Sequence, residues 1–183
     1  MNQNQTADAP APAALIKAFI NTRDVEAGTD EFASAAGLGG WLRSQGLVRS
    51  TSGLDASDLK LAVALREALR TSLIAHHDGD VEPAAPALGR LARDLPLRVV
   101  FPAGGPRLEP ADGGVRGALE QVLASVSQSV ADGSWPRLKV CPADDCSWAF
   151  YDTSKNRSRT WCSMQTCGNR AKTRTFRARQ AGS

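Results

Sequence analysis

The ten residues "WCSMQTCGNR", at positions 161–170, contain two of the four cysteines of this 183-residue chain. The other two precede them, so that the full pattern is C-x4-C, fifteen intervening residues and C-x4-C. Two close pairs of thiols joined by a short loop are typical of a tetrahedral metal site, because each pair supplies one edge of the tetrahedron. The spacing predicts one Zn²⁺ per chain, with four ligands: Cys141, Cys146, Cys162 and Cys167.

Two other chemistries could use the same four residues. Two disulfides, connected in any of three ways, or a redox pair would need an oxidising compartment. The first residues, "MNQNQTADAPAPAALIKAF", have neither the basic region nor the apolar run of a signal peptide, and no segment approaches the length of a membrane span. We therefore expect a cytoplasmic protein with reduced thiols and no membrane partner. Zinc is favoured over disulfides, and an iron–sulfur cluster is the third alternative.

Charge divides the chain into two unequal parts. The net charge of +3 combines residues 1–135, which carry 12 Lys/Arg and 16 Asp/Glu, with residues 136–183, which carry 10 Lys/Arg and three Asp. The second part also holds half of the ten aromatic residues in about a quarter of the chain. A mildly acidic body and a basic tail that contains all the cysteines indicate two domains with different partners.

The pattern of apolar residues predicts a mainly α fold with a small β-sheet (α+β). We expect a disordered N-terminus over residues 1–11, a helical domain over 12–134, and a small zinc finger over 136–180, made of a short hairpin and a helix. The clearest helix is "DASDLKLAVALREALRTSLIAHHDG", in which Asp55 or Ser57 can serve as the N-cap and the apolar surface is wide.

Shorter elements complete the predicted body. A first helix begins at Pro12, and two short helices follow, one capped by Asp30 and ending at Ala36 and one between the glycines of "GLGGWLRSQGLV". A helix over Pro86–Leu95 leads to two strands, "PLRVVF" and "RLEP", and "VRGALEQVLASVSQSVADG" is the last helix of the body.

The finger itself is predicted to contain two strands, a basic loop and a terminal helix. The strands are "RLKV" and "SWAFYD", and the loop is "TSKNRSR". Five residues of a helix turn by about 500°, which would leave Cys162 and Cys167 on different faces. Cys167 is therefore expected at the start of the final helix, where Asn169 can brace the turn.

The final helix is basic all round. At 100° per residue, Arg170, Arg174 and Arg177 share one narrow arc. Like charges at i,i+4 destabilise a helix by ~0.2–0.5 kcal/mol per pair, which a bound polyanion would offset. Duplex DNA is the predicted polyanion, and a merely solvated basic face is the alternative. The predicted DNA contacts are Lys155, Arg157, Arg159, Arg170, Lys172, Arg174, Arg177 and Arg179.

Other motifs give weaker signals. The aromatic residues near the cysteines could stack on bases, but a domain so small needs them for its own core. The sequence His76-His77-Asp78, with Asp80, lacks further ligands for a hydrolase site. We expect no catalytic activity.

The stretch from Cys141 to about Arg179, and "FYDTSKNRSRTWCSMQTCGNR" with "CGNRAKTR" above all, resembles the CGNR zinc finger family. The preceding body resembles the ABATE domain through "FINTRD", "TDEF" and "WLRSQGLV". This resemblance implies a bacterial, stress-related transcription regulator in which the four cysteines bind zinc. It also implies a finger that binds DNA and a body, mostly helical with a small sheet, that senses a ligand.

The resulting hypothesis is a transcription regulator that joins the nucleoid when it binds DNA. Asn21, Arg23 and Trp41 are the predicted ligand-binding residues, because they combine polar groups with an aromatic wall near the end of the first helix. The alternative for them is structural: a helix cap, an ion pair and a core residue. The expected partners are duplex DNA, a small ligand and a second copy of the chain. The alternatives are an RNA- or protein-binding zinc module and a small-molecule enzyme in the body.

Overall fold

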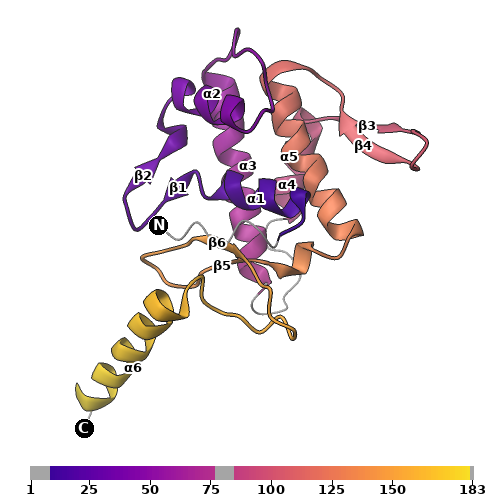
Figure 1. The fold of residues 1–183 in the computed structure, drawn as a ribbon. Coiled ribbons are helices and arrows are strands. Elements are labelled where there is room, and N and C mark those ends of the chain that lie inside the picture. The colour runs from indigo at the N-terminus through magenta and orange to yellow at the C-terminus, as the bar shows by residue number, and fades with distance from the viewer. Residues whose placement is uncertain (1–8, 77–84, 182–183) are drawn as a thin grey trace.

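The computed structural model describes residues 9–76 and 85–181 and shows a helical body with one helix projecting from it (Figure 1). The first half contains α1 (Ala11–Ile20), the hairpin β1 (Arg23–Asp24) and β2 (Thr29–Asp30), the 3₁₀ turn η2 (Glu31–Ala33), α2 (Ala35–Ser44) and α3 (Ala56–Ala75). The second half contains α4 (Ala85–Asp94), the hairpin β3 (Leu97–Val100) and β4 (Arg107–Pro110), α5 (Gly114–Ala131), η3 (Trp135–Arg137), the hairpin β5 (Leu138–Val140) and β6 (Ala149–Tyr151), the π-helical turn η4 (Met164–Gly168) and α6 (Asn169–Ala181).

Helix α3, which has the wide apolar surface noted in the sequence, packs at the centre of the body. Asp55 caps it by accepting hydrogen bonds from the backbone N–H groups of Ser57 and Asp58, and the Asp58 side chain accepts from the Asp55 N–H. This reciprocal capping satisfies N–H groups that a helix N-terminus would otherwise leave unpaired. The helix buries Leu65, Leu69 and Leu73 completely against α1, α2 and α5.

A buried arginine joins α3 to the first hairpin. The Arg66 side chain is 1% exposed and donates two hydrogen bonds to the Asp30 carboxylate, of 2.6 and 2.8 Å. It also donates to the Thr22 hydroxyl and lies over the Phe32 ring. Because a buried charge is costly unless it is paired, this arrangement fixes β2 and η2 against α3.

The prediction of two short helices before α3 was wrong in its boundaries. Asp30 caps only the turn η2, and α2 then runs through the glycines as one helix that begins after Ser34. A Cβ at Gly37 would lie 1.9 Å from the Glu31 carbonyl oxygen. Gly37 therefore allows α2 to approach η2 closely, instead of ending a helix.

The last hairpin belongs to the core of the body. Leu138, Val140 and Ala149, from β5 and β6, lie in the same buried cluster as Ile16 of α1 and Leu69 of α3. The boundary predicted after residue 134 thus follows the end of α5 in the sequence, but the apolar core continues across it.

The predicted fold class, mainly α with a helical N-terminal part and a C-terminal hairpin and helix, is confirmed. The strands form three separate antiparallel pairs instead of one small sheet. Among the described helices, none is long and apolar enough to cross a membrane. Residues 1–8 of the predicted disordered N-terminus, and His77, Asp78 and Asp80, lie outside the described residues, whereas Ala11 already begins α1.

Candidate metal centre and nucleic-acid interface

Four different local structures bring the four cysteines together. Cys141 directly follows β5, and Cys146 lies in the turn before β6, where Ser147 adopts a left-handed conformation with φ of 52°. Cys162 follows the long loop after β6. Cys167 lies in the turn η4, which Ser163 caps by accepting a hydrogen bond from the Thr166 N–H. Sequence analysis placed Cys167 at the start of the final helix; in the structure it lies in η4, two residues before α6 begins at Asn169.

The four sulfur atoms form one compact cluster. The Sγ atoms all lie within 4.8 Å of one another. Cys162 Sγ lies 3.6 Å from Cys146 Sγ and from Cys167 Sγ. A tetrahedral site with Zn–S bonds of about 2.3 Å places its sulfurs about 3.8 Å apart. All four cysteines are free of disulfides. The donor set therefore fits one zinc ion, and zinc is the cofactor of this site.

The thiols also need a cation for electrostatic reasons. Hydrogen bonds from the thiols of Cys146 and Cys162 hold the pKa of Cys141 well below its usual range. The thiolate favoured there raises the pKa of Cys146 to about 12 and raises that of Cys162 as well. The Cys141 thiolate thus opposes ionisation of Cys146 and Cys162, whereas a bound divalent cation allows all the ligands to be thiolates.

Arg170, the arginine of the CGNR sequence, is directed toward the metal centre. One guanidinium nitrogen lies 3.3 Å from Cys167 Sγ, and the other lies 3.0 Å from Glu26 and 3.3 Å from Asp145. Cys167 and Glu26 together raise the pKa of Arg170. Sequence analysis placed Arg170 among the DNA contacts; in the structure its guanidinium instead braces a ligand and links the finger to the β1–β2 turn.

Arg159 has a similar internal role. It donates hydrogen bonds to the backbone carbonyls of Trp161, at 2.9 Å, and Cys162, and its guanidinium lies 5.1 Å from the centre of the Phe150 ring. These contacts hold the loop that delivers Cys162. Two of the eight predicted DNA contacts thus bind protein groups next to the metal centre.

A buried ion pair folds the rest of that loop, and sequence analysis missed it. Lys139 Nζ lies 2.8 Å from the Asp152 carboxylate and also donates to the carbonyls of Arg157 and Arg159. Asp152 is fully buried. Burial raises its pKa, but hydrogen bonds from Lys139, Ser154 and the Arg159 N–H outweigh that effect and lower it to about 2. The sequence signal was a lysine in the middle of one short strand and an aspartate directly after the next.

The body holds the hairpin half of the metal centre directly. The Asn21 side chain donates to the Ala149 carbonyl and accepts from the Ala149 N–H, at 2.9 and 2.7 Å. Arg70 donates to the carbonyls of Ser147, next to Cys146, and Ile20. His76 forms a hydrogen bond of 2.7 Å with the Leu138 carbonyl oxygen. The elements α1 and α3 therefore position the turn that carries Cys146.

The three predicted ligand-binding residues do not converge on one pocket wall in the structure. Asn21 binds β6, as described above. Arg23 is half exposed and lies 3.9 Å from Glu67. Trp41 is buried and packs edge-on against Phe19 and Phe32. Trp41 is thus a core residue and Arg23 lies near an acidic side chain, as the structural alternative described, although that side chain is a glutamate of α3. The Asn21 side chain does not cap α1, contrary to that alternative; only its backbone N–H caps the helix.

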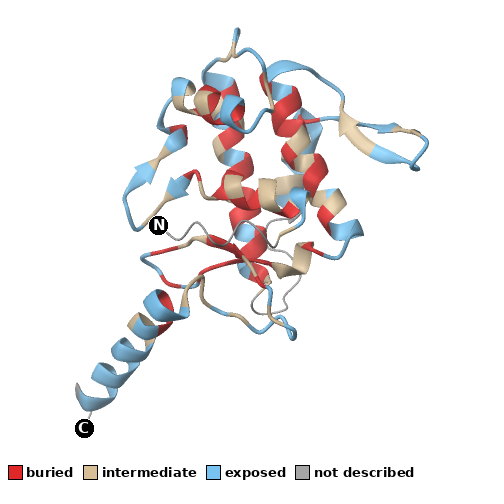
Figure 2. Cartoon of the chain, viewed as in Figure 1, coloured by how far each residue is buried: buried red, intermediate tan, exposed pale blue. Residues whose placement is uncertain are grey.

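Helix α6 projects from this centre and is exposed along most of its length (Figure 2). Arg174 lies 4.0 Å from Asp145, on the same side as Arg170. Lys172 and Arg179 lie on the opposite side of the helix, together with Phe176, which is 61% exposed. The loop residues Lys155 and Arg157 are exposed too. Six predicted DNA contacts therefore lie at the surface of the same end of the molecule: Lys155, Arg157, Lys172, Arg174, Arg177 and Arg179.

Comparison with known protein families gives two matches. Residues 137–180 match the family described as "CGNR zinc finger", a span that contains all four cysteines and all eight basic residues predicted to contact DNA. Residues 13–133 match the ABATE family, described as "Putative stress-induced transcription regulator". No curated protein matches the chain. The chain therefore belongs to the ABATE family and carries a CGNR zinc finger after its ABATE domain.

Proposed function

We propose that the protein is a transcription regulator that binds duplex DNA by inserting α6 into the major groove. The observation that carries this proposal is a projecting, solvent-exposed helix with basic residues on opposite sides and no acidic residue of its own. No Asp or Glu follows Asp152 in the sequence, which leaves eight Lys/Arg in that stretch. Such a surface attracts a polyanion and has nothing on the helix itself to neutralise it.

The dimensions of α6 favour the major groove. Its 13 residues extend about 20 Å, at a rise of about 1.5 Å per residue. The major groove, about 12 Å wide, admits an α-helix, whereas the minor groove, about 6 Å wide, does not. With Arg174 and Arg177 on one side and Lys172 and Arg179 on the other, the helix can reach phosphates on both walls of the groove.

The metal centre supplies the fixed base of this helix. Zinc joins Cys162 and Cys167, which precede α6, to Cys141 and Cys146, which belong to the hairpin that the body holds. Cys167 lies only two residues before the start of α6. The direction of the helix is therefore set by the ligand geometry, and the proposal assigns no catalytic step to the chain.

For the body, we propose a ligand-sensing role at a different place from the one that sequence analysis predicted. A hollow of about 560 Å³ lies between α1, α5 and the segment that follows α2. Its lining includes Leu15, Leu47, Gln121 and Gln128. Its volume is in the usual range for small-molecule sites, with apolar walls and a few amides. The test is a thermal-shift screen in which Gln121→Leu removes the response to a hit and Arg23→Ala does not.

Selection of bound DNA from a random duplex pool tests the DNA-binding function. The full chain should enrich a sequence. If about five phosphates are neutralised, the logarithm of its affinity should fall with the logarithm of salt concentration at a slope of roughly −4 to −5. Deletion of residues 169–183 should abolish binding. Equal affinity of the deleted and full chains would contradict the proposal, and preference for single-stranded RNA in competition would favour the RNA-binding alternative. In the cell we expect cytoplasmic protein associated with the nucleoid.

A further inference from the structure

A recess with basic and hydroxyl side chains lies beside the hairpin. The recess, of about 310 Å³, is lined by five residues of η3, β6 and the loop that follows: Arg137, Tyr151, Thr153, Ser154 and Lys155. From this recess, we infer that the finger binds a backbone phosphate of the same nucleic acid that α6 enters. The inference deepens the proposed function and rests on it for the identity of the phosphate.

Several hydrogen-bond donors in the recess have no protein partner. Among the described residues, the Tyr151 hydroxyl, the Thr153 hydroxyl and Lys155 Nζ form no hydrogen bond or ion pair. Arg137 uses one nitrogen, Nη1, to donate to the carbonyls of Asp152 and Ser154, at 3.0 and 2.9 Å. This pair of bonds fixes the guanidinium while its other nitrogens remain available for a ligand.

The acidic residue nearest to the recess is neutralised elsewhere. The Asp152 carboxylate accepts hydrogen bonds from Lys139 Nζ and the Arg159 N–H on one oxygen and from Ser154 on the other. Its side chain is 0% exposed. The recess therefore presents two cations and two free hydroxyl groups without an exposed carboxylate among its lining residues. Phosphate oxygens are recognised by this combination of Arg, Lys and hydroxyl donors.

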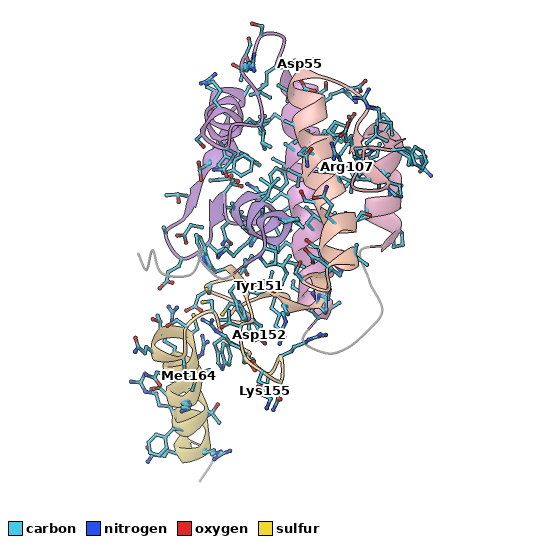
Figure 3. The ribbon with its side chains drawn as sticks, turned by 45° about the vertical axis from the view of Figure 1, so that its right-hand side comes forward. Asp55, Arg107, Tyr151, Asp152, Lys155 and Met164 are labelled. Carbon is cyan, nitrogen blue, oxygen red and sulfur yellow. The ribbon has the colours of Figure 1, made fainter. Side chains whose placement is uncertain are left out.

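The place of the recess favours a nucleic-acid phosphate over an isolated anion. Lys155 lies at the tip of its loop, at the end of the molecule from which α6 projects and opposite Asp55 (Figure 3). Arg157, two residues further along the exposed loop, has a left-handed backbone with φ of 53°. A duplex that accepts α6 in one groove can thus meet a second basic element of the finger. Phosphate contacts of this kind set the orientation of a protein on DNA.

The experiment compares three variants in the full chain. Tyr151→Phe with Thr153→Val removes both hydroxyls and keeps the size of each side chain, and should weaken duplex binding about tenfold without changing the salt slope. Lys155→Gln should lower the magnitude of the slope by about 0.9, because one fewer counterion is released. Thr160→Val removes an exposed hydroxyl outside the recess and should leave affinity unchanged. A double variant that binds within about twofold of the parent would overturn the inference.

Inorganic phosphate distinguishes failure of this inference from failure of the proposed function. In an NMR titration of the full chain, phosphate should shift the amides of residues 151–155 and should no longer do so in the double variant. If these shifts occur but the full chain binds neither duplex DNA nor single-stranded RNA, the recess is a phosphate site and the DNA-binding function is wrong. If DNA binds and neither phosphate nor the double variant has an effect, the function stands and the recess is not a site.

Discussion

The two halves of the metal centre differ in what holds them in place. Cys141 and Cys146 lie in the connection between the two strands of a hairpin that is buried in the core of the body and fastened by Asn21 and Arg70. Cys162 and Cys167 lie in a loop and a turn that lead to α6, which packs mainly on its own preceding turn. The first half therefore has many supports besides the metal, whereas the second depends on the metal and a few side chains. This difference separates a fixed base from a helix that nucleic acid can reach.

Cys162→Ser should have the largest effect, because it removes a metal ligand from the less supported half. Structural zinc contributes on the order of 10–16 kcal/mol in finger peptides, so we expect η4 and α6 to lose their order. DNA binding should disappear, while α1 and α3 stay folded. Hydrogen exchange measured by mass spectrometry should show loss of protection over residues 161–181 and retained protection over 56–75. Thr160→Val is the control. Global unfolding of Cys162→Ser would contradict the conclusion that the body and its hairpin have supports besides the metal.

Lys139→Met should have the next largest effect, because it breaks the buried pair of the fixed half. Removing one partner of a buried ion pair typically costs about 3–5 kcal/mol, since the other charge stays buried and unpaired. We expect this loss in urea denaturation of the zinc-loaded protein. Lys155→Met, in the exposed loop nearby, should change stability by about 0.5 kcal/mol or less. Equal midpoints for the two variants would show that the Asp152 pair does not hold the loop.

Acid should weaken the Lys139–Asp152 ion pair over a defined pH range. The folded pKa of Asp152 is lowered to about 2, against about 3.9 for an unfolded aspartate. Its stabilising contribution, roughly 2–3 kcal/mol, is present above pH ~4 and is lost as the pH falls from ~4 toward ~2. The free energy of unfolding should be followed in chelator-treated protein, so that metal release does not contribute. The cysteines are the same in the parent and in Asp152→Asn, so their protonation cancels when the two are compared. Asp152→Asn should show a shallower decrease, and an identical decrease would contradict the assignment.

Asn21→Ala should weaken the attachment of the hairpin to α1 more modestly. It leaves the N–H and C=O of buried Ala149 without the amide that binds both, which costs about 1–3 kcal/mol. Thermal unfolding should report the loss, and zinc content should stay at one ion per chain. Asn156→Ala, at an exposed loop position, is the matched control. A variant as stable as the control would mean that core packing alone positions β6.

Asp145→Asn should have the smallest effect, and it should increase the affinity for DNA instead of lowering it. Asp145 pairs with Arg170 and Arg174 at the base of α6, so under the proposed function it would compete with DNA phosphate for them. Exposed pairs contribute about 0.2–1 kcal/mol, and the affinity for DNA should therefore rise by at most about fivefold. Asp144→Asn changes the net charge equally at an exposed neighbour without an ion pair among the described residues. Only the excess of the first variant over the second reports the competition.

The sequence by itself determined the parts of this protein whose chemistry is local. The spacing of the cysteines indicated a four-thiolate zinc site, because only a few ligand geometries suit two close pairs. Asp55 predicted the start of α3, because a helix N-terminus needs a side-chain acceptor. The two strands around 97–110 followed from the apolar residues of "PLRVVF" and the turn "PAGGP" after it. These features depend on residues a few positions apart, and the structure confirms them.

Only the tertiary structure decided which distant residues act together. Asn21 binds Ala149, 128 positions away, and Arg70 binds Ser147, 77 positions away. Periodicity predicts that a helix has a buried face, but it does not say which element covers that face. For the same reason, Arg159 and Arg170 belonged to a basic surface by sequence, and the fold turned them toward carbonyl, thiol and carboxylate groups. Their charges were local information, and their partners were determined by how the finger packs on the body.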